Sequence, residues 1–211
     1  MSDEGALRAR ICKMAELLYM RGYAHGSTGN ISVKTGEGII ITPTNSCMGL
    51  LEPHRLSLVD KDGNHVSGDK PSKEAFLHLA MYGERPESQA IVHLHSTHSV
   101  ALSILEDTDP DDAMPPLTAY ARMKLGRLAV VPYFRPGDRA LAEAVRLRAR
   151  EHHAVLLANH GPVVAGKSLD DAVFSAEELE ETAKLELLTR DRPRRMLTPC
   201  QLADLDAAFP N

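Results

Sequence analysis

The stretch AIVHLH, residues 90–95, decides how this sequence folds, because an apolar run leads into two histidines separated by one residue. Alternate side chains of a β-strand point to the same face of a sheet, so His93 and His95 can bind one ion from such a strand. A second apolar run, residues 154–158, leads in the same way to His160, which is followed by glycine. The sequence therefore predicts two buried strands that carry three histidines at their ends.

Three neutral imidazoles suit a catalytic metal ion, because they leave a divalent ion its full charge and an open coordination position. A His-x-His pair alone is about as often an ordinary polar strand end. The third histidine in a matching context favours the metal interpretation. Among the nearby histidines, we expect His78 to be a surface residue beside Glu74, with a role as fourth ligand as the alternative. We expect His98 to support the metal ligands from behind or to be structural, and not to be a ligand.

Composition narrows the class of protein. The chain has 211 residues, of which 43% are hydrophobic and 25% are charged, so we expect one globular domain over residues 1–211. The net charge of −5 gives no reason to expect binding to nucleic acid or to an anionic membrane. The sequence shows no signal peptide and no run that could span a bilayer, and its three cysteines are widely spaced. We therefore expect a cytoplasmic protein with free thiols.

Helical and strand patterns alternate around the two histidine strands. Residues 31–41 and 56–66 each have the pattern of a hairpin, with turn residues between two short apolar runs. Pro71 and Ser72 are expected to open a helix, and the residues after Ser168 and Thr198 have the pattern of capped helix starts. This mixture of hairpins and helices predicts a layered α/β domain. Further helices are expected at residues 2–22, through residues 100–104, and from a start at residues 136–138 through residue 145, with a further strand at 128–131.

Two polar turns and one helix start offer donors for an anion. The loop GSTGN (residues 26–30) and the turn TPTNS (residues 42–46) are each weak motifs when taken alone. Residues 70–74 set a hydroxyl and an ammonium at a helix N-terminus, where unpaired amides favour anions. An equally good interpretation is that Ser72 is an ordinary N-cap. In the first loop, the backbone amides could face an anion, with Ser27, Thr28 and Asn30 as additional donors.

A tyrosine and two cations follow in the second half of the chain. The Tyr120 hydroxyl is a candidate general acid. Lys124 or Arg135 could orient a carboxylate, although both could equally be surface cations.

Five short motifs occur in a fixed order along the chain, namely Gly29-Asn30, Thr42-Pro43-Thr44, Pro71-Ser72-Lys73-Glu74, Val92-His93-Leu94-His95 and Asn159-His160-Gly161. In this order and spacing the chain resembles the class II aldolase and adducin head family, from the first helix to about residue 190. Within that family it looks closest to the 3-oxo-tetronate 4-phosphate decarboxylases.

The resemblance implies a three-layer α/β/α domain with a central, mainly antiparallel sheet. It also implies a homotetramer with sites near the subunit interfaces. His93, His95 and His160 would bind Zn2+, although another divalent ion such as Mn2+ or Co2+ would suit the same ligands. Glu74 would be the acid/base residue beside the metal. The positions that match phosphate-binding residues are Gly29, Asn30, Thr44 and Ser72, with Asn45 and Lys73 as neighbours.

The implied reaction is metal-dependent decarboxylation of 3-oxo-tetronate 4-phosphate to dihydroxyacetone phosphate and carbon dioxide, through a metal-stabilised enediolate. Glu74 or Tyr120 would then protonate the enediolate. Two features depart from the sugar-phosphate aldolases of the family. Lys73 stands where those enzymes usually have a second serine, and the C-terminal tail carries Phe209 in place of a tyrosine.

Three other interpretations compete with the decarboxylase. A class II aldolase would cleave a short phosphorylated ketose, of the fuculose- or ribulose-phosphate type, and release an aldehyde. A non-catalytic, adducin-like assembly module would have lost metal ligands, so the intact histidine set counts against it. A cupin or a dinuclear metal hydrolase could also carry a His-x-His pair, but the prominent helices and the lack of nearby aspartates disfavour both.

Overall fold

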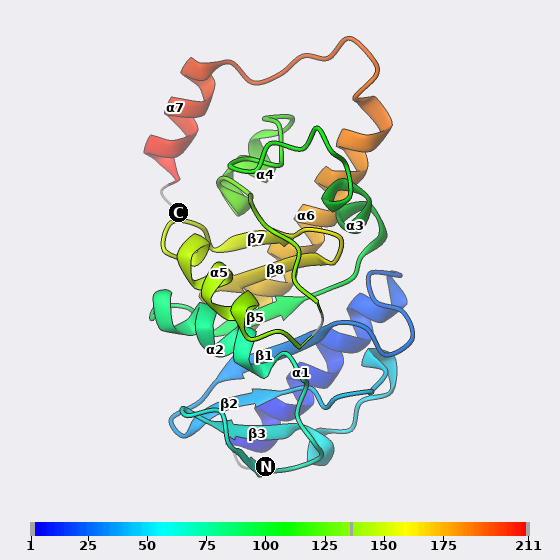
Figure 1. Ribbon diagram of the computed structural model, residues 1–211, viewed down its shortest axis with the longest axis vertical. Helices are drawn as coiled ribbons and strands as arrows, with labels where there is room; N and C mark the ends of the chain where they lie inside the picture. The colour runs from blue at the N-terminus through cyan, green and yellow to red at the C-terminus, as the bar shows by residue number, and fades with distance from the viewer. Residues whose placement is uncertain (1–2, 136, 210–211) are drawn as a thin grey trace.

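The computed structural model describes residues 3–135 and 137–209, and its centre is one eight-stranded sheet with the order β4-β3-β2-β1-β5-β8-β7-β6 (Figure 1). Neighbouring strands run antiparallel except β6 and β7, which run parallel. The expected α/β fold with a mainly antiparallel sheet is therefore confirmed. The strands are β1 (Asn30–Lys34), β2 (Gly38–Ile41), β3 (Ser57–Asp60), β4 (His65–Ser67), β5 (Ala90–His93), β6 (Ala129–Val131), β7 (Ala154–Leu157) and β8 (Gly161–Gly166).

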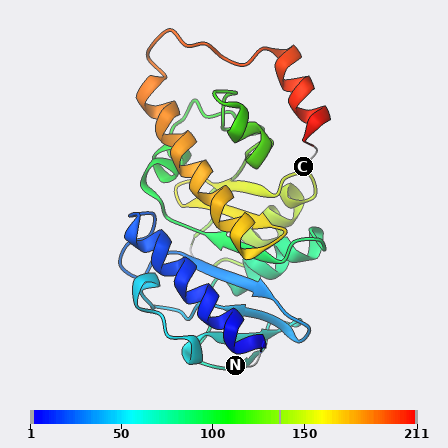
Figure 2. The same cartoon turned by 180° about the vertical axis from the view of Figure 1, so that it is seen from behind.

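Helices cover both faces of the sheet and make the three predicted layers. The long helices α1 and α6 lie on one face, whereas α2 and α5 lie on the other (Figures 1 and 2). Successive side chains of β5 point to opposite faces of the sheet. Val92 packs into the core under α1 and α6, and Ile91 packs into the core under α2 and α5, so both faces need a helical cover. The helices are α1 (Asp3–Met20), α2 (Ala75–Glu84), α3 (Thr97–Ser103), α4 (Ala119–Leu125), α5 (Ala140–Ala149), α6 (Leu169–Thr189) and α7 (Pro199–Ala208), with 3-10 turns η1 (Met48–Leu50) and η2 (Pro53–Arg55).

The local signals read from the sequence are confirmed at the hairpins and at two helix starts. β1 pairs with β2, and β3 pairs with β4, as predicted. The Ser168 side chain accepts a hydrogen bond from the amide of Asp171 at the start of α6. Thr198 and Gln201 form a reciprocal capping box at the start of α7. These contacts satisfy amides that the first turn of a helix leaves unpaired.

The start of α2 differs from the prediction. The helix begins at Ala75, three residues later than expected. Pro71 forms an isolated β-bridge with Pro43, and the Ser72 amide donates to the carbonyl of Thr42 (3.3 Å). Residues 71–72 are therefore held in extended pairing and cannot join the helix, and Glu74 occupies the N-cap position.

The two histidine segments meet because β5 and β8 are antiparallel neighbours. His93 ends β5 and lies opposite Val163 in β8, which starts directly after His160. Strand β5 is shorter than the sequence predicted, because it ends at His93 and His95 lies beyond that end. The Leu94 amide still donates to the carbonyl of Pro162 (3.2 Å), which keeps the segment between β5 and α3 beside the β7–β8 turn. All three histidines thus reach the same end of the sheet.

Cys12 and Cys47 are partly buried and Cys200 is exposed, and all three are free thiols, as expected. In the part of the chain that the structure describes, every helix is too short or too polar to cross a bilayer. Pro136, the first residue of the predicted helix start at residues 136–138, lies outside the described residues.

Candidate metal centre

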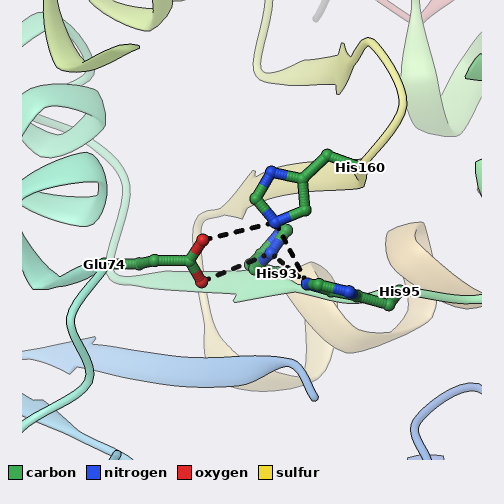
Figure 3. A group of neighbouring side chains, drawn as sticks. All are labelled: Glu74, His93, His95 and His160. Carbon is green, nitrogen blue, oxygen red and sulfur yellow. Dashed lines mark hydrogen bonds and ion pairs between the residues drawn. The ribbon is translucent and has the colours of Figure 1, made fainter. Parts of the chain in front are cut away.

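Four donor side chains meet beyond the end of β5 (Figure 3). The Nε2 atom of His95 lies 3.1 Å from Nε2 of His93 and 3.1 Å from Nε2 of His160. The Glu74 carboxylate closes the group, with Oε2 3.4 Å from Nε2 of His93 and Oε1 3.3 Å from Nε2 of His160. The structure brings together the three predicted histidines and the predicted carboxylate, all with donor atoms within 4.8 Å of one another.

The backbone holds the His93 ring in one orientation. Its Nδ1 atom lies 2.8 Å from the carbonyl oxygen of Pro162. A carbonyl can only accept, so Nδ1 carries the proton and the lone pair of Nε2 faces the other donors. A carbonyl that holds the outer nitrogen of an imidazole in this way is the usual support behind a metal-binding histidine.

Burial sets the charge of the donors. Burial lowers the pKa of the His93 imidazole, and it lowers that of His95 to about 3 with help from the neighbouring His93 and His160 rings. Burial alone would raise the pKa of the Glu74 carboxyl, but His93, His160 and the Asn30 amide together lower it by more. At neutral pH His93 and His95 therefore offer neutral imidazole nitrogens beside the ionised Glu74 carboxylate.

This donor set fits a divalent metal ion. Ligand atoms about 2.0–2.2 Å from a tetrahedral ion lie about 3.3–3.6 Å from one another. The four contacts between neighbouring donors measure 3.1, 3.1, 3.3 and 3.4 Å. Imidazole and carboxylate are also the ligand types that zinc, cobalt and manganese share. The geometry and the chemistry of the donors both support a metal site.

Glu74 is held by elements on both sides. At the N-cap position of α2, its backbone amide donates to Oγ of Ser72 (3.2 Å). Its carboxylate accepts a hydrogen bond from Nδ2 of Asn30 (2.8 Å). Asn30 starts β1 directly opposite His93 of β5 in the antiparallel register. The sheet and the start of α2 therefore both determine where the carboxylate lies.

The candidate phosphate-binding segments lie beside this carboxylate. The Ser72 amide donates to the carbonyl of Thr42, and the Thr44 amide donates to the carbonyl of Lys70 (3.3 and 3.0 Å), which aligns the two segments side by side. The side chain of Lys73 is exposed. The chain therefore passes directly from this pair of segments, through Ser72 and Lys73, to the donor Glu74.

Two of the candidate phosphate-binding residues have a left-handed backbone. Gly29 has φ of +78° and Asn45 has φ of +55°. A Cβ atom at Gly29 would lie 3.0 Å from the carbonyl oxygen of His93 and 3.1 Å from Sδ of Met48. Glycine is therefore required where this loop passes the end of β5.

Tyr120, the other predicted catalytic residue, lies in a different part of the chain. It is 53% exposed on α4, and it lines a hollow of about 530 Å³ with Lys124, His153 and Phe209. Lys124 forms an ion pair with Asp171 there (3.2 Å). None of the four donors lines this hollow. Within one chain the structure does not bring Tyr120 to the histidines.

A second hollow, of about 450 Å³, lies directly at the histidines. Apart from the two metal-binding histidines, the sequence pointed to only one residue that lines this hollow, Asn159, through its position beside His160. Arg135, the other candidate for orienting a carboxylate, is not among these lining residues and lies 4.0 Å from Asp138. The lining residues are His25, His95, Thr97, Val100, Tyr133, Phe134, Asn159 and His160.

The chain matches the family model described as class II aldolase and adducin N-terminal domain over residues 9–187. The chain belongs to the class II aldolase and adducin family. The matched region contains all four donors and the segments beside Glu74, whereas α7 lies outside it. The expected family membership and fold are confirmed.

Proteins with known names are similar over almost the whole chain. A 3-oxo-tetronate 4-phosphate decarboxylase from Escherichia coli is 49% identical over 210 residues, which cover 97% of this chain and 99% of that protein. An L-fuculose phosphate aldolase from Methanocaldococcus jannaschii is 39% identical over 181 residues, which cover 86% and 96%. The crystal structure of YgbL from Escherichia coli superposes with a TM-score of 0.94 at 48% identity, covering 96% and 98%.

Proposed function

We propose that this protein decarboxylates 3-oxo-tetronate 4-phosphate to dihydroxyacetone phosphate and carbon dioxide, with a divalent metal ion at Glu74, His93, His95 and His160. The observation that carries the proposal is this intact cluster in a chain 49% identical to a decarboxylase of that name. Zinc is the ion we propose, since three imidazoles and a carboxylate are typical zinc ligands. The protein would then be a carbon–carbon lyase.

The substrate explains the need for such a centre. A β-keto acid that loses its carboxylate keeps the bonding electrons, so negative charge develops towards the former ketone oxygen. A bound divalent ion would supply Lewis-acid charge at this point. The side chains of the protein must bind the substrate phosphate, exclude water and deliver a proton to the carbon that lost the carboxylate.

The phosphate-binding role falls to the aligned segments beside Glu74. Ser72 and Thr44 offer hydroxyl groups, and the loop at Gly29 approaches His93 closely enough to bring backbone amides near the donors. Lys73 adds a positive charge on the exposed side. A dianionic phosphate is stabilised by such a combination of donors and charge.

Two residues compete as proton donor. The lowered pKa of Glu74 makes this carboxylate a base at neutral pH, so it can donate only after it has taken up a proton. Tyr120 is a hydroxyl acid, but in this chain it faces the hollow with Lys124 and Phe209. Its use would require a second copy of the chain, in keeping with a homotetramer whose sites lie near subunit interfaces. A cytoplasmic location, supported by three free thiols, completes the proposal.

The second candidate is a class II aldolase that cleaves a short phosphorylated ketose. It is favoured by the 39% identity to an L-fuculose phosphate aldolase, and the same cluster would serve it. A non-catalytic assembly module has no such support, because all four donors are in place.

A product assay tests the proposal. Metal-loaded protein is incubated with 3-oxo-tetronate 4-phosphate and, separately, with fuculose and ribulose phosphates. We expect carbon dioxide and dihydroxyacetone phosphate in equal amounts, and no product after chelation of the metal. Aldehyde release from a ketose phosphate without carbon dioxide would establish the aldolase instead. In E74Q with bound metal, we expect turnover to fall about 10²–10⁴-fold, and full turnover would show that Glu74 is not an acid/base residue.

A further inference from the structure

A line of buried polar side chains runs from Glu74 into the layer between the sheet and α2. Asn30 and Ser32 alternate along β1, and His78 and Tyr82 lie one turn apart on α2, so each pair faces the other element. All four are buried, with Ser32 and His78 fully inaccessible to solvent. The expectation that His78 is a surface residue is therefore wrong, and it is not one of the four donors either.

The hydrogen bonds along this line are continuous. Nδ2 of Asn30 lies 2.8 Å from Oε2 of Glu74, and Oδ1 of Asn30 lies 2.5 Å from Nε2 of His78. Nδ1 of His78 lies 2.7 Å from Oγ of Ser32. The Tyr82 hydroxyl lies 3.0 Å from Oγ and 3.1 Å from the carbonyl oxygen of Ser32. Among the described residues, the side chains that bond to the two nitrogens of His78 are those of Asn30 and Ser32.

The ionised carboxylate at one end determines the direction of every bond. A carboxylate only accepts, so the Asn30 atom that faces it is the NH2 group and the opposite atom is the carbonyl oxygen. That oxygen needs a donor, so Nε2 of His78 carries the proton. Nδ1 is then an acceptor for the Ser32 hydroxyl, and the Tyr82 hydroxyl donates towards Ser32. Burial supports the neutral ring, since it lowers the pKa of His78 to about 3.

This line of polar side chains lies in an apolar layer, where burying polar groups lowers the stability of the fold unless each group is paired. The neighbouring positions in the same layer are apolar, among them Ile41 and Ile91, which flank Ser32 in the register of the sheet, and Leu77 and Met81 on α2. Buried polar groups cost stability unless every one is paired, whereas apolar side chains fill such a layer without that requirement. At one end the line contacts the ionised carboxylate of Glu74, and at the other the ammonium of Lys34 lies 5.0 Å from the centre of the Tyr82 ring.

We propose that His78 is a positioning residue for Glu74. Its Nε2–H fixes the Asn30 amide so that the NH2 group, and not the carbonyl oxygen, faces the Glu74 carboxylate. Without that donor the amide is free to flip, and an oxygen would then face an oxygen. Glu74 would lose its place against His93 and His160. The inference rests on the proposed role of Glu74 at the metal centre.

Two substitutions at the same position separate the two sides of the ring. In H78Q the amide nitrogen of glutamine lies near the place of Nε2 and can still donate to Asn30. In H78N the shorter amide can reach Ser32 but leaves the Asn30 oxygen without a donor. The readout is zinc affinity, measured by competition with a chromogenic chelator, with Tm as a control for folding.

We expect H78N to bind zinc about 10–100-fold more weakly than the unsubstituted protein, as is usual when a residue behind a metal ligand is lost. H78Q should stay within about threefold. N30A should weaken zinc binding as much as H78N does, and N30A/H78N should be less than about threefold worse than N30A alone, because His78 acts through Asn30. Y82F, at the far end of the line, should lower Tm but keep zinc affinity within about threefold.

Several outcomes would overturn the proposal. These are unchanged affinity in H78N, equal losses in H78Q and H78N, losses in N30A/H78N that multiply, or a loss in Y82F as large as in H78N. Should H78N fail to fold, N30A carries the test, and unchanged zinc affinity in N30A would be decisive against it. Zinc affinity needs no substrate, so the inference and the proposed reaction can fail separately. An unsubstituted protein without turnover would reject only the reaction.

Discussion

The candidate metal centre and the C-terminal helix α7 are built in opposite ways. At the candidate metal centre, donors come from the start of α2, the end of β5 and the β7–β8 turn, and hydrogen bonds from Asn30 to Glu74 and from His93 to Pro162 hold two of them in place. The C-terminal helix α7 has no buried residue, and it reaches the rest of the molecule through a connection that arches away from α6 (Figures 1 and 2). Its main contact is with α4, where Arg122 pairs with Asp206 through two hydrogen bonds (2.7 and 2.6 Å).

This difference separates a region on which both the stability and the chemistry of the chain depend from a region whose stability is local. The centre depends on long-range packing, so a change there should disturb both folding and metal binding. Helix α7 depends on its own caps and a surface ion pair, so a change there should stay local. The family match ends at residue 187, before α7 begins, which agrees with this division.

The largest expected difference comes from the same substitution in the two regions. L156A in β7 removes a fully buried side chain from the core, so we expect the free energy of unfolding to fall by about 2–5 kcal/mol. L205A in α7 removes a partly exposed side chain, and we expect less than about 1 kcal/mol. Urea unfolding followed by circular dichroism measures both. Equal losses would show that α7 belongs to the same cooperative unit as the sheet.

A loss at the metal centre should come next in size. H95A removes one of the four donors, and we expect zinc affinity to fall at least about 100-fold, or about 2.7 kcal/mol. D206N in α7 is the matched control, since it weakens the pair with Arg122 far from the donors. The measurement is chelator competition. A similar loss in D206N would mean that α7 is coupled to a metal centre.

The sequence predicted the donors because their signals are local. His93, His95 and His160 each follow an apolar run, and strand patterns place such residues at the ends of core strands. The conformation around His95 was not predicted in this way, because β5 ends at His93 and the residues after it are placed by long-range contacts, such as the hydrogen bond from the Leu94 amide to Pro162.

His78 shows what local patterns leave out. A histidine four residues after a glutamate on a helix is usually solvated, and the sequence gives no other local signal. Its partners Asn30 and Ser32 come from β1, more than forty residues earlier, and only the packing of α2 on the sheet reveals them. Asn30 itself was expected to bind phosphate, yet both polar ends of its side chain contact Glu74 and His78.

The buried histidine makes the stability of the centre sensitive to acid. The folded-state pKa of His78 is lowered to about 3, against about 6.5 when unfolded, so the unfolded chain binds more protons between these values. The stability contribution is present above pH 6.5 and is lost as the pH falls towards 3. Between pH 7 and pH 5 we expect metal-free protein to lose about 2 kcal/mol through this group. Urea unfolding at both pH values should show a loss smaller by that amount in H78Q, and an equal loss would assign the effect to other groups.

The smallest effect should come from the cap of α7. T198A removes the side chain that accepts from the amide of Gln201, which costs a helix start about 1 kcal/mol. Because α7 has no buried residue, the cost should appear as local fraying. Amide hydrogen exchange in α7 should quicken about fivefold, while protection in β5 and β7 stays unchanged. A fall in zinc affinity in T198A would show that α7 contacts a metal centre. Because α7 does not reach the four donors of its own chain, that centre would belong to a neighbouring copy.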